Sequence, residues 1–480
     1  CKKITMYLKY VLIVFLGISV ACCADKGDSG NIGEFSSENF KVEVGGESVF
    51  VYQARVSKYP INQNWPGYQR PLEQTEIASF ASFDYEAGKT VRITTEQKIE
   101  SCDIRPKEFG IIPEVKGNTI EFVVTNPCQF VVEVNGHHKA LHLFVNPKEQ
   151  IQVDKEDSRI HYYGPGVHEA GVINVKSDET VYIDEGAIVY GVIRSENTSN
   201  IKVIGKGILD ASRIARGVAP HMISLHKVRN AYIGGIILRD AHEWGVVPSC
   251  CDQVTFDNIK LIGFWRYNSD GIDIVNSSNI VIKNSFIRAF DDNIAIKGLQ
   301  WAYEEQQTIK GIRVDNCVLW NDWGKIFEFG AETVADTIQD VMISNCYVPR
   351  FTMVAMDIQN GDRGHIENVV FNNISIEEPI RERAMLGDTP MDTKGWGRAI
   401  SLGIYGTQWS SDVTRGSIDN IRFSNIRCTG SSFSSIELKG YDEKHQVSNV
   451  YIKDYFVNGT KITGDEAIQK NDFVTNVVWE

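Results

Sequence analysis

The sequence lacks the features that mark a nucleic-acid-binding or zinc-binding protein. Its 49 Lys and Arg residues form no basic block, and the formal net charge is −13, which disfavours nucleic acid as a partner and, more weakly, a strongly anionic polymer. The ten cysteines include no CxxC pair and no Cys/His cluster with metal-ligand spacing, so we expect no metal and no other cofactor. Only 13 prolines accompany 40 glycines, a composition that suits many tight turns.

Long hydrophobic runs are also scarce. The run at residues 10–23, "YVLIVFLGISVACC", follows Lys2 and Lys3 and is too short to predict a membrane span. It resembles a bacterial lipoprotein signal in which "SVAC" is the lipobox and Cys22, or alternatively Cys23, carries the lipid. A plain signal peptide or membrane anchor is the alternative. We therefore expect a signal peptide at 1–23, a polar linker at 24–39, and an exported protein anchored in the periplasm or on the outer membrane of a Gram-negative bacterium.

Residues 40–160 alternate apolar and polar side chains in short runs such as "FKVEV", "KTVRITTE" and "QFVVEVNG". Gly, Asn and Pro separate these runs, which is typical of a β-sandwich. Seven cysteines remain after Cys1, Cys22 and Cys23 are set aside, and at most one disulfide is expected among them, between Cys102 and Cys128.

Residues 161–480 are dominated by a repeat. Units such as "NIKVIGKGILDA", "NIVIKNSFIRAF" and "NVVFNNISIEEP" each consist of a short strand, a turn at Asn or Gly, and a second strand. One interval, from Val369 to Ile421, is longer and predicts a loop of about 25 extra residues. Such units bury their apolar faces by stacking, so the fold class is all-β: a right-handed parallel β-helix preceded by a β-sandwich domain. Six turn asparagines are expected to form a ladder, and Cys317 and Cys346 to stack as buried thiols: Asn258, Asn284, Asn316, Asn345, Asn373 and Asn425.

Three aspartates interrupt this pattern in "NSDGIDI" and "FDDNIAIKG". Asp270 and Asp291 are 21 residues apart, close to one coil, so stacking would place them on neighbouring rungs about 4.8 Å apart. Asp292 adds a third carboxylate. Like charges at that distance raise at least one pKa and cost stability. Turn capping explains any one of the three; three together indicate catalysis.

These motifs resemble the "NTDG" and "DD" motifs of the polygalacturonase family of glycoside hydrolases. The resemblance implies that Asp291 is the general acid and that Asp270 and Asp292 activate water, with inversion at the anomeric carbon. An inverting mechanism needs room for a water between its carboxyl groups and an acid that stays protonated.

Two positions depart from that family. Trp323 in "NDWGKIFEFG" replaces the histidine of a Gly-His-Gly motif, and "MDIQNG" places Asp357 and Gln359 where an Arg-Ile-Lys motif would hold a substrate carboxylate. The two-domain layout is more similar to the dextranase and isopullulanase family, which joins a β-sandwich to a β-helix, lacks that histidine and acts on neutral α-glucans. The aspartate spacing matches the polygalacturonases more closely, so the resemblance places the chain between the two families, in the glycoside hydrolase clan that they share. "HYYGPGVHEAG" also resembles a junction of that family.

Further residues near the aspartates are candidates for substrate binding. Trp265, Tyr267 and Trp323 could stack on sugar rings, and His242, Lys297, Lys325 and Glu328 could contact sugar hydroxyls together with Asp357 and Gln359. Packing under loops, or a position on a solvated face, is the alternative explanation for each.

The sequence thus predicts an inverting glycoside hydrolase that acts on a neutral polysaccharide or oligosaccharide. A polygalacturonase-like pectin hydrolase and a non-catalytic glycan-binding β-helix remain as alternatives, and a polysaccharide lyase is disfavoured because no clear basic residue is placed for that chemistry. No nucleic acid is expected as a partner, the membrane is expected to be contacted only through the lipid anchor, and the default oligomeric state is a monomer.

Overall fold

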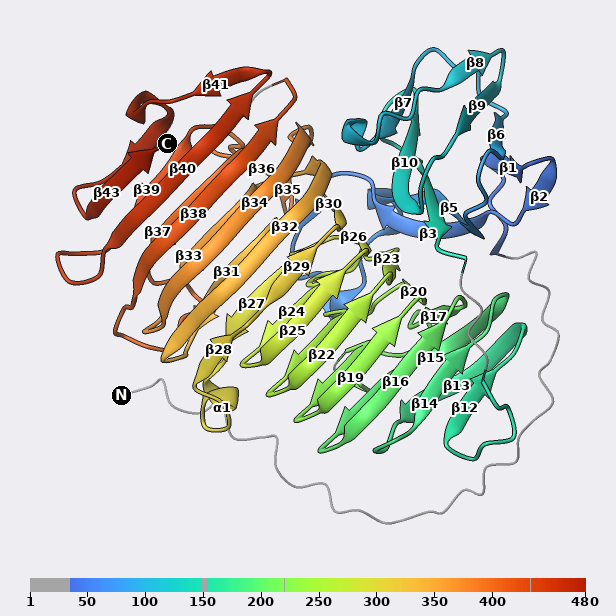
Figure 1. Cartoon of the computed structure of the whole chain (residues 1–480), viewed down its shortest axis with the longest axis horizontal. Helices are drawn as coiled ribbons and strands as arrows, with labels where there is room; N and C mark the ends of the chain where they lie inside the picture. Colours follow the sequence, from blue (N-terminus) through green and yellow to red (C-terminus); the bar gives the residue numbers. More distant parts are fainter. Residues whose placement is uncertain (1–34, 149–152, 220, 432) are drawn as a thin grey trace.

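The computed structural model describes residues 35–148, 153–219, 221–431 and 433–480. In these ranges strands make up most of the regular structure, and one short α-helix is present, α1 (Gln300–Tyr303) (Figure 1). None of the described helices has the length and apolar character needed to cross a bilayer. The signal peptide predicted at 1–23, with its lipid-bearing Cys22 or Cys23, lies outside the described residues and stays a prediction.

The predicted β-sandwich is present and consists of two five-stranded sheets. The first sheet has the order β2 (Glu47–Val49), β1 (Phe40–Val44), β6 (Thr90–Thr95), β9 (Thr119–Val123), β8 (Glu114–Lys116), and the second β3 (Tyr52–Ser57), β5 (Thr75–Asp84), β11 (Leu141–Asn146), β10 (Cys128–Val134), β7 (Cys102–Arg105). Alternate residues such as Val42, Ile93 and Leu143 face inward and form the sandwich core. The alternation in the sequence therefore reflects one buried face for each sheet.

The prediction of a disulfide between Cys102 and Cys128 is wrong, because both are free thiols. Cys102 pairs with Val134 at the end of β10, whereas Cys128 begins β10 and pairs with Val145 of β11. The length of β10 therefore separates the two cysteines, roughly 20 Å. A disulfide requires Cα atoms within about 7 Å.

The predicted parallel β-helix is confirmed. It runs diagonally across Figure 1 from β12 to β43 and is built of three parallel ladders, named ladders A, B and C. Ladder A contains β13 (Gly166–Asn174), β15 (Ala187–Glu196), β18 (Ile223–His226), β21 (Val246–Ser249), β24 (Ile272–Val275), β27 (Ile294–Gly298), β31 (Lys325–Thr333), β33 (Val354–Asn360), β37 (Arg398–Ile404), β39 (Ile436–Lys439) and β42 (Ile468–Lys470).

Ladder B contains β12 (Ile160–Tyr163), β14 (Thr180–Ile183), β16 (Ser199–Gly205), β19 (Arg229–Gly234), β22 (Asp252–Asp257), β25 (Ser278–Lys283), β28 (Thr308–Lys310), β29 (Arg313–Asp315), β32 (Thr337–Phe351), β34 (His365–Pro379), β38 (Ser417–Cys428), β40 (Val447–Val457) and β43 (Val474–Trp479). Ladder C contains β17 (Ile208–Asp210), β20 (Ile237–Arg239), β23 (Lys260–Ile262), β26 (Phe286–Ala289) and β30 (Val318–Asn321), and continues into the C-terminal part of β32. A short strand, β41 (Thr460–Ile462), folds back on β40.

Aligned side chains hold the coils together. The inward-facing positions are mostly Ile, Val and Phe, and the rings of Phe371 and Phe423 stack with centroids 5.1 Å apart. Cys317 and Cys346 are buried free thiols, as predicted.

The six turn asparagines all have positive φ, 52–57°, and Asn316 donates to Asn284, Asn373 to Asn345, and Asn425 to Asn373. Two links differ from the prediction, because Asn284 and Asn345 instead donate to Asp257 and Asp315.

The sandwich packs against the outer face of ladder C. Phe80, Val131 and Phe144 of its second sheet share one apolar cluster with residues of β17, β20, β26 and β30, among them Phe286 and Trp320. At the edge of this interface Arg105 pairs with Glu133 and Glu377, and Arg350 also pairs with Glu133. The sandwich therefore has a fixed position on the solenoid.

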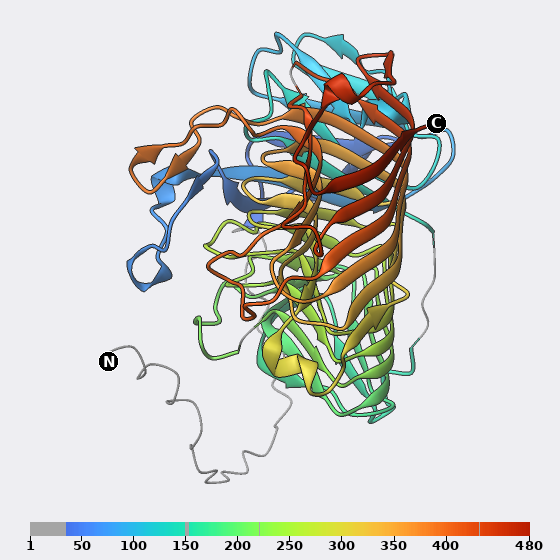
Figure 2. The same ribbon diagram turned by 90° about the vertical axis from the view of Figure 1, so that its left-hand side faces the viewer.

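Two connections extend from this interface and meet each other. Residues 59–74 of the sandwich carry β4 (Ile61–Asn62), η2 (Pro66–Tyr68) and η3 (Leu72–Gln74), and the predicted insertion between β34 and β37 carries β35 (Met385–Leu386) and β36 (Thr389–Pro390). β4 pairs with β35, and the two segments project together from one side of the solenoid (Figure 2). Trp65, Phe290, Trp323, Ala384 and Trp396 form a buried group, called the loop cluster below, that joins both segments to the solenoid.

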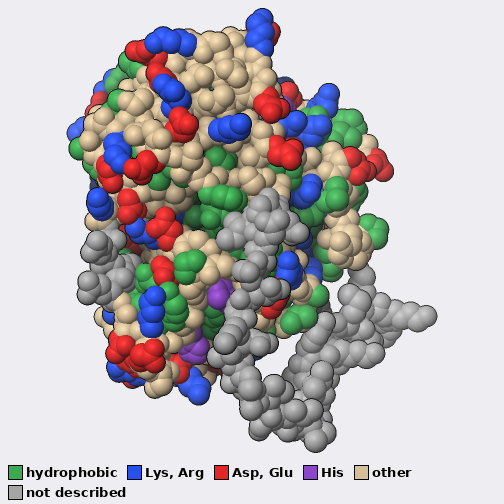
Figure 3. Space-filling model, turned by 90° about the vertical axis from the view of Figure 1, so that its right-hand side faces the viewer, with side chains coloured by type: hydrophobic (Ala, Val, Ile, Leu, Met, Phe, Trp, Pro, Cys, Tyr) green, Lys and Arg blue, Asp and Glu red, His purple; other side chains and the backbone are tan. Residues whose placement is uncertain are grey.

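Charged side chains of both signs are interspersed over the face in Figure 3. This agrees with the absence of a basic block in the sequence.

Candidate active site

The three predicted aspartates lie at the start of consecutive strands of ladder A. Asp270 precedes β24, and Asp291 and Asp292 precede β27. The Gly271 N–H donates to the Asp292 carbonyl (2.8 Å), and the Asp291 N–H donates to the Ser269 carbonyl (3.2 Å). The strand register therefore sets Asp270 beside Asp292, with Asp291 adjacent. The coil repeats after 22 residues at this point, whereas 21 residues separate Asp270 from Asp291, so the register partner of Asp270 is Asp292.

The backbone of Gly324 and Lys325 lies close to the carboxylates of Asp291 and Asp292. The Lys325 N–H donates to Asp292 Oδ1 (2.8 Å). A Cβ atom at Gly324 would lie 2.5 Å from Asp292 Oδ1 and 2.7 Å from Asp291 Oδ1, so only glycine fits at this position. Asn293 anchors the turn by donating to the carbonyls of Ile287 and Trp320. The two carboxylate oxygens converge on the same small space above Gly324.

Asp270 is part of a buried ion-pair group that the sequence did not reveal. Lys297 Nζ lies 3.3 Å from Asp270 Oδ2 and 3.2 Å from Asp273 Oδ1, and all three side chains are buried. Burial, and then the neighbouring carboxylates, raise the pKa of Asp270 well above its usual range and that of Asp273 to about 7. Lys297, predicted to contact sugar hydroxyls, forms ion pairs with both of these carboxyl groups. In the sequence Asp273 stands between Ile272 and Ile274, so its side chain points to the opposite face of the strand from theirs. This alternation was the signal in the sequence that could have identified Asp273 as a residue of the site.

Asp291 is only partly buried, unlike Asp270 and Asp292. Desolvation raises the pKa of Asp291 well above its usual range, with further contributions from the charges of Asp270 and Asp292. A carboxyl group with a raised pKa keeps its proton to a higher pH than a free carboxyl group, and with some access to solvent it can donate that proton to a substrate. The arrangement thus distinguishes Asp291 from its two neighbours.

A second acidic pair lies on the next coils. Glu328 of β31 and Asp357 of β33 are register partners, and both are buried. Lys325 Nζ lies 3.4 Å from Glu328 Oε1 and 3.4 Å from Gln359 Oε1. Burial raises the pKa of Glu328 and of Asp357. The structure therefore brings together Lys325, Glu328, Asp357 and Gln359, four of the residues predicted to bind substrate.

The aromatic residues predicted to stack on sugar rings differ in how exposed their side chains are. Tyr267 is half-buried, and its ring stacks with that of Tyr68 at 6.1 Å. The guanidinium of Arg216 lies 4.0 Å from the Tyr68 ring centroid. Tyr68 comes from η2 of the sandwich connection, so its position depends on domain packing and could not be read from the motifs.

Two other aromatic predictions, Trp265 and Trp323, are wrong as open stacking surfaces. Trp265 is 7% exposed, and Arg266 and Arg55 approach its ring. Trp323 is 6% exposed and packs in the loop cluster against Phe290 and Trp396.

The prediction that His242 lines the site is also wrong. Its side chain is 3% exposed, and its Nε2 lies 2.7 Å from the Ala219 carbonyl. It borders the site only through its backbone carbonyl, which accepts a hydrogen bond from Arg216.

The buried carboxyl group of Asp273 predicts how stability depends on pH. A carboxyl whose pKa is raised in the folded state binds its proton more tightly there than in the unfolded chain. The free energy of unfolding is therefore expected to fall as the pH rises from about 4 to about 7, by up to about 1.4 kcal/mol per pH unit for one proton. Urea unfolding at several pH values measures this slope. Asp273→Asn should make it shallower, and an unchanged slope in that variant would contradict the assignment.

Comparison with known proteins shows what this solenoid is similar to. Residues 173–383, which contain all three aspartates, match the family model Glycosyl hydrolases family 28. The resemblance to the glycoside hydrolase clan is thereby confirmed.

Individual proteins are similar to parts of the chain. A protein of Arabidopsis thaliana described as a probable polygalacturonase is 23% identical over 246 residues, 49% of each chain, and the endo-polygalacturonase of Pectobacterium carotovorum subsp. carotovorum is 30% identical over 166 residues, 32% of this chain and 39% of the relative. The chain thus spans at most about half the length of these relatives. Dex49A from Penicillium minioluteum matches 97% of both chains with a TM-score of 0.63 at 13% identity. Its fold is therefore shared over both the sandwich and the solenoid.

Proposed function

We propose that this protein is an inverting glycoside hydrolase acting on a polysaccharide or oligosaccharide. The observation that carries the proposal is the convergence of the Asp291 and Asp292 carboxylates above Gly324, with Asp270 beside them on the preceding coil. The matched family model, which spans these residues, supports it.

The three aspartates divide the reaction between them. Asp291 donates its proton to the glycosidic oxygen as the bond from the anomeric carbon to that oxygen breaks. A water held by Asp270 and Asp292 attacks the same carbon from the opposite face and gives its proton to one of these carboxylates. Asp270 Oδ1 is buried and has no hydrogen-bond partner among the described residues, so it is free to hold this water.

A neutral sugar suits the charges around the site. Lys297 pairs with Asp270 and Asp273, Lys325 with Glu328, and Arg216 with Glu243. Because all three cationic side chains are already paired with carboxylates of the protein, none of them is available to bind a substrate carboxylate. A pectin hydrolase is the second candidate, because the sequence relatives are named polygalacturonases.

A product screen tests the reaction and the substrate together. Purified protein is incubated with neutral α-glucans, galactans and pectins, and proton NMR follows the anomeric signal of the earliest product. We expect release from a neutral glycan with inversion of the anomeric configuration. Release from pectin alone would favour the second candidate, and a retained configuration would contradict the mechanism.

A further inference from the structure

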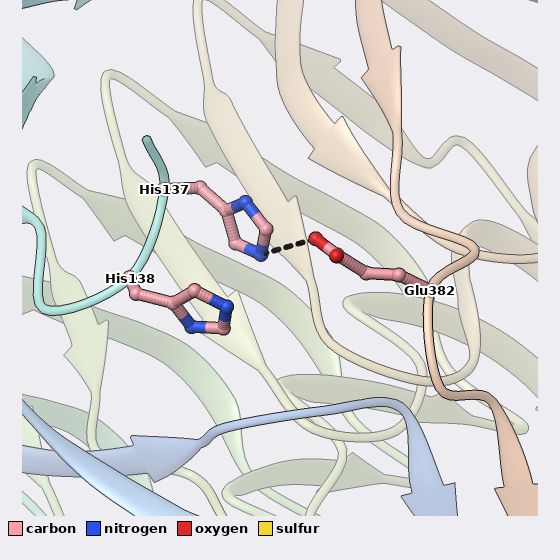
Figure 4. A group of neighbouring side chains, drawn as sticks. All are labelled: His137, His138 and Glu382. Atoms are coloured by element: carbon pink, nitrogen blue, oxygen red, sulfur yellow. Dashed lines mark ion pairs between the residues drawn. The ribbon is translucent and has the colours of Figure 1, made fainter. Parts of the chain in front are cut away.

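Two histidines and a glutamate meet where the sandwich touches the insertion. His137 and His138 lie in the turn between β10 and β11, and Glu382 follows β34. His137 Nε2 is 3.7 Å from Glu382 Oε1, and the two imidazole rings are 4.3 Å apart. One ligand atom from each of the three residues lies within 4.8 Å of the other two (Figure 4).

A buried carboxylate orients His138. Its Nδ1 lies 3.0 Å from Glu76 Oε2, and the other oxygen of Glu76 accepts the Lys139 N–H (2.9 Å). Because Nδ1 carries the proton that binds Glu76, the lone pair of His138 is on Nε2. One ring nitrogen of His138 faces His137 and Glu382 in Figure 4. A carboxylate that fixes the tautomer and ring orientation in this way is typical of histidines that bind metals.

His137 is also placed to act as a ligand. Its Nε2 points toward Glu382 Oε1 in Figure 4, and its side chain is 15% exposed, so a small ion can reach this nitrogen. The three side chains thus offer two imidazole nitrogens and one carboxylate oxygen to the same space.

We propose that His137, His138 and Glu382 bind a divalent transition-metal ion of the Zn²⁺ type, with Glu76 as the positioning residue for His138. Two imidazoles and one carboxylate satisfy three positions of a tetrahedral site, and water can take the fourth, since the Glu382 side chain is 61% exposed. Imidazole ligands favour Zn²⁺ over Ca²⁺, which takes oxygen ligands. The sequence pattern predicted no metal, because Glu382 is distant in sequence from the histidine pair.

The ion would fasten the insertion to the sandwich. Glu382 lies two residues before Ala384 of the loop cluster and three before β35, which pairs with β4. Arg383 next to it contacts Tyr59 of the sandwich connection. Metal binding should therefore stabilise the two segments beside the aspartates, which are residues 59–74 and the insertion between β34 and β37.

The test is a Zn²⁺ titration by calorimetry of the full chain, produced without a polyhistidine tag and treated with a chelator. We expect one Zn²⁺ per chain at this site with micromolar or tighter affinity, and no Ca²⁺ binding there. Glu382→Gln should weaken Zn²⁺ binding about tenfold or more. The matched control is Asp388→Asn, which changes an exposed carboxylate of the same insertion and should leave the affinity unchanged.

A second readout separates this site from the cysteines. Co²⁺ bound at His137, His138 and Glu382 should give visible absorption without a thiolate charge-transfer band. Absence of Zn²⁺ binding, or binding that is equally tight in Glu382→Gln and His138→Gln, would overturn the proposal. Since Glu382 is exposed, the glutamine variant should fold, and its thermal unfolding without metal should match that of the wild type.

Discussion

Replacement of Asp291 by asparagine is expected to reduce kcat roughly a thousandfold. Asparagine has nearly the same shape, but it has no proton to give to the departing oxygen. Glycan binding should persist, because the other contacts remain, and the free energy of unfolding at pH 7 should not fall, because asparagine has nearly the shape of the protonated acid and adds no charge to this group of close carboxyl groups. Reducing-sugar release, affinity electrophoresis and urea unfolding measure the three quantities.

Substrates with different leaving groups distinguish the acid from the water-activating residues. An aryl glycoside with an acidic phenol needs little protonation, so Asp291→Asn should lose much less activity on it, whereas Asp270→Asn and Asp292→Asn should lose as much as on the natural glycan. Asp340→Asn is the matched control, because its turn position has a φ of 57°, which asparagine tolerates as well as aspartate does. Unchanged hydrolysis by Asp291→Asn would remove the proposed acid. Glycan binding by the wild type without any release of reducing sugar would favour a glycan-binding protein without catalysis.

Much of the fold follows from local pattern. Asparagines such as Asn316 and Asn373 mark turns with positive φ, and the Ile and Val between them face inward, so the coil can be read from short stretches of sequence. The motif around Asp270, Asp291 and Asp292 was informative for the same reason, because all three lie at the start of neighbouring strands.

The remaining features of the site depend on contacts between distant segments. Trp265 is buried because Arg55 of the sandwich and Arg266 approach its ring, and Tyr68 reaches Tyr267 from a sandwich connection. The partners of Lys297 depend on strand register, which varies with the length of each coil. Local spacing specifies neither domain packing nor exact register, so the predictions for Trp265 and Trp323 failed, while the three aspartates came together.

Loss of the buried ammonium group in Lys297→Met is expected to reduce the free energy of unfolding at pH 7 by about 3–5 kcal/mol, the usual cost of leaving buried charges without their partner. Asp270 and Asp273 would then face each other without a cation. The deficit should shrink as the pH falls to about 5, since both carboxyl groups can take up protons. Urea unfolding at the two pH values measures it, and Lys310→Met, at an exposed position, should change stability by no more than about 0.5 kcal/mol.

The same substitution should also affect catalysis. Without Lys297 the pKa of Asp270 rises further, so the carboxylate that holds the water forms only at higher pH. The acidic limb of the plot of rate against pH should therefore shift to higher pH. At a fixed pH on that limb, the rate should fall about tenfold for each pH unit of the shift. The double variant Lys297→Met/Asp273→Asn removes one like charge together with the cation, so it should regain part of the lost stability and move the limb back. A profile that stays in place in Lys297→Met would show that Lys297 supports the fold alone and that Asp270 does not depend on it for its charge.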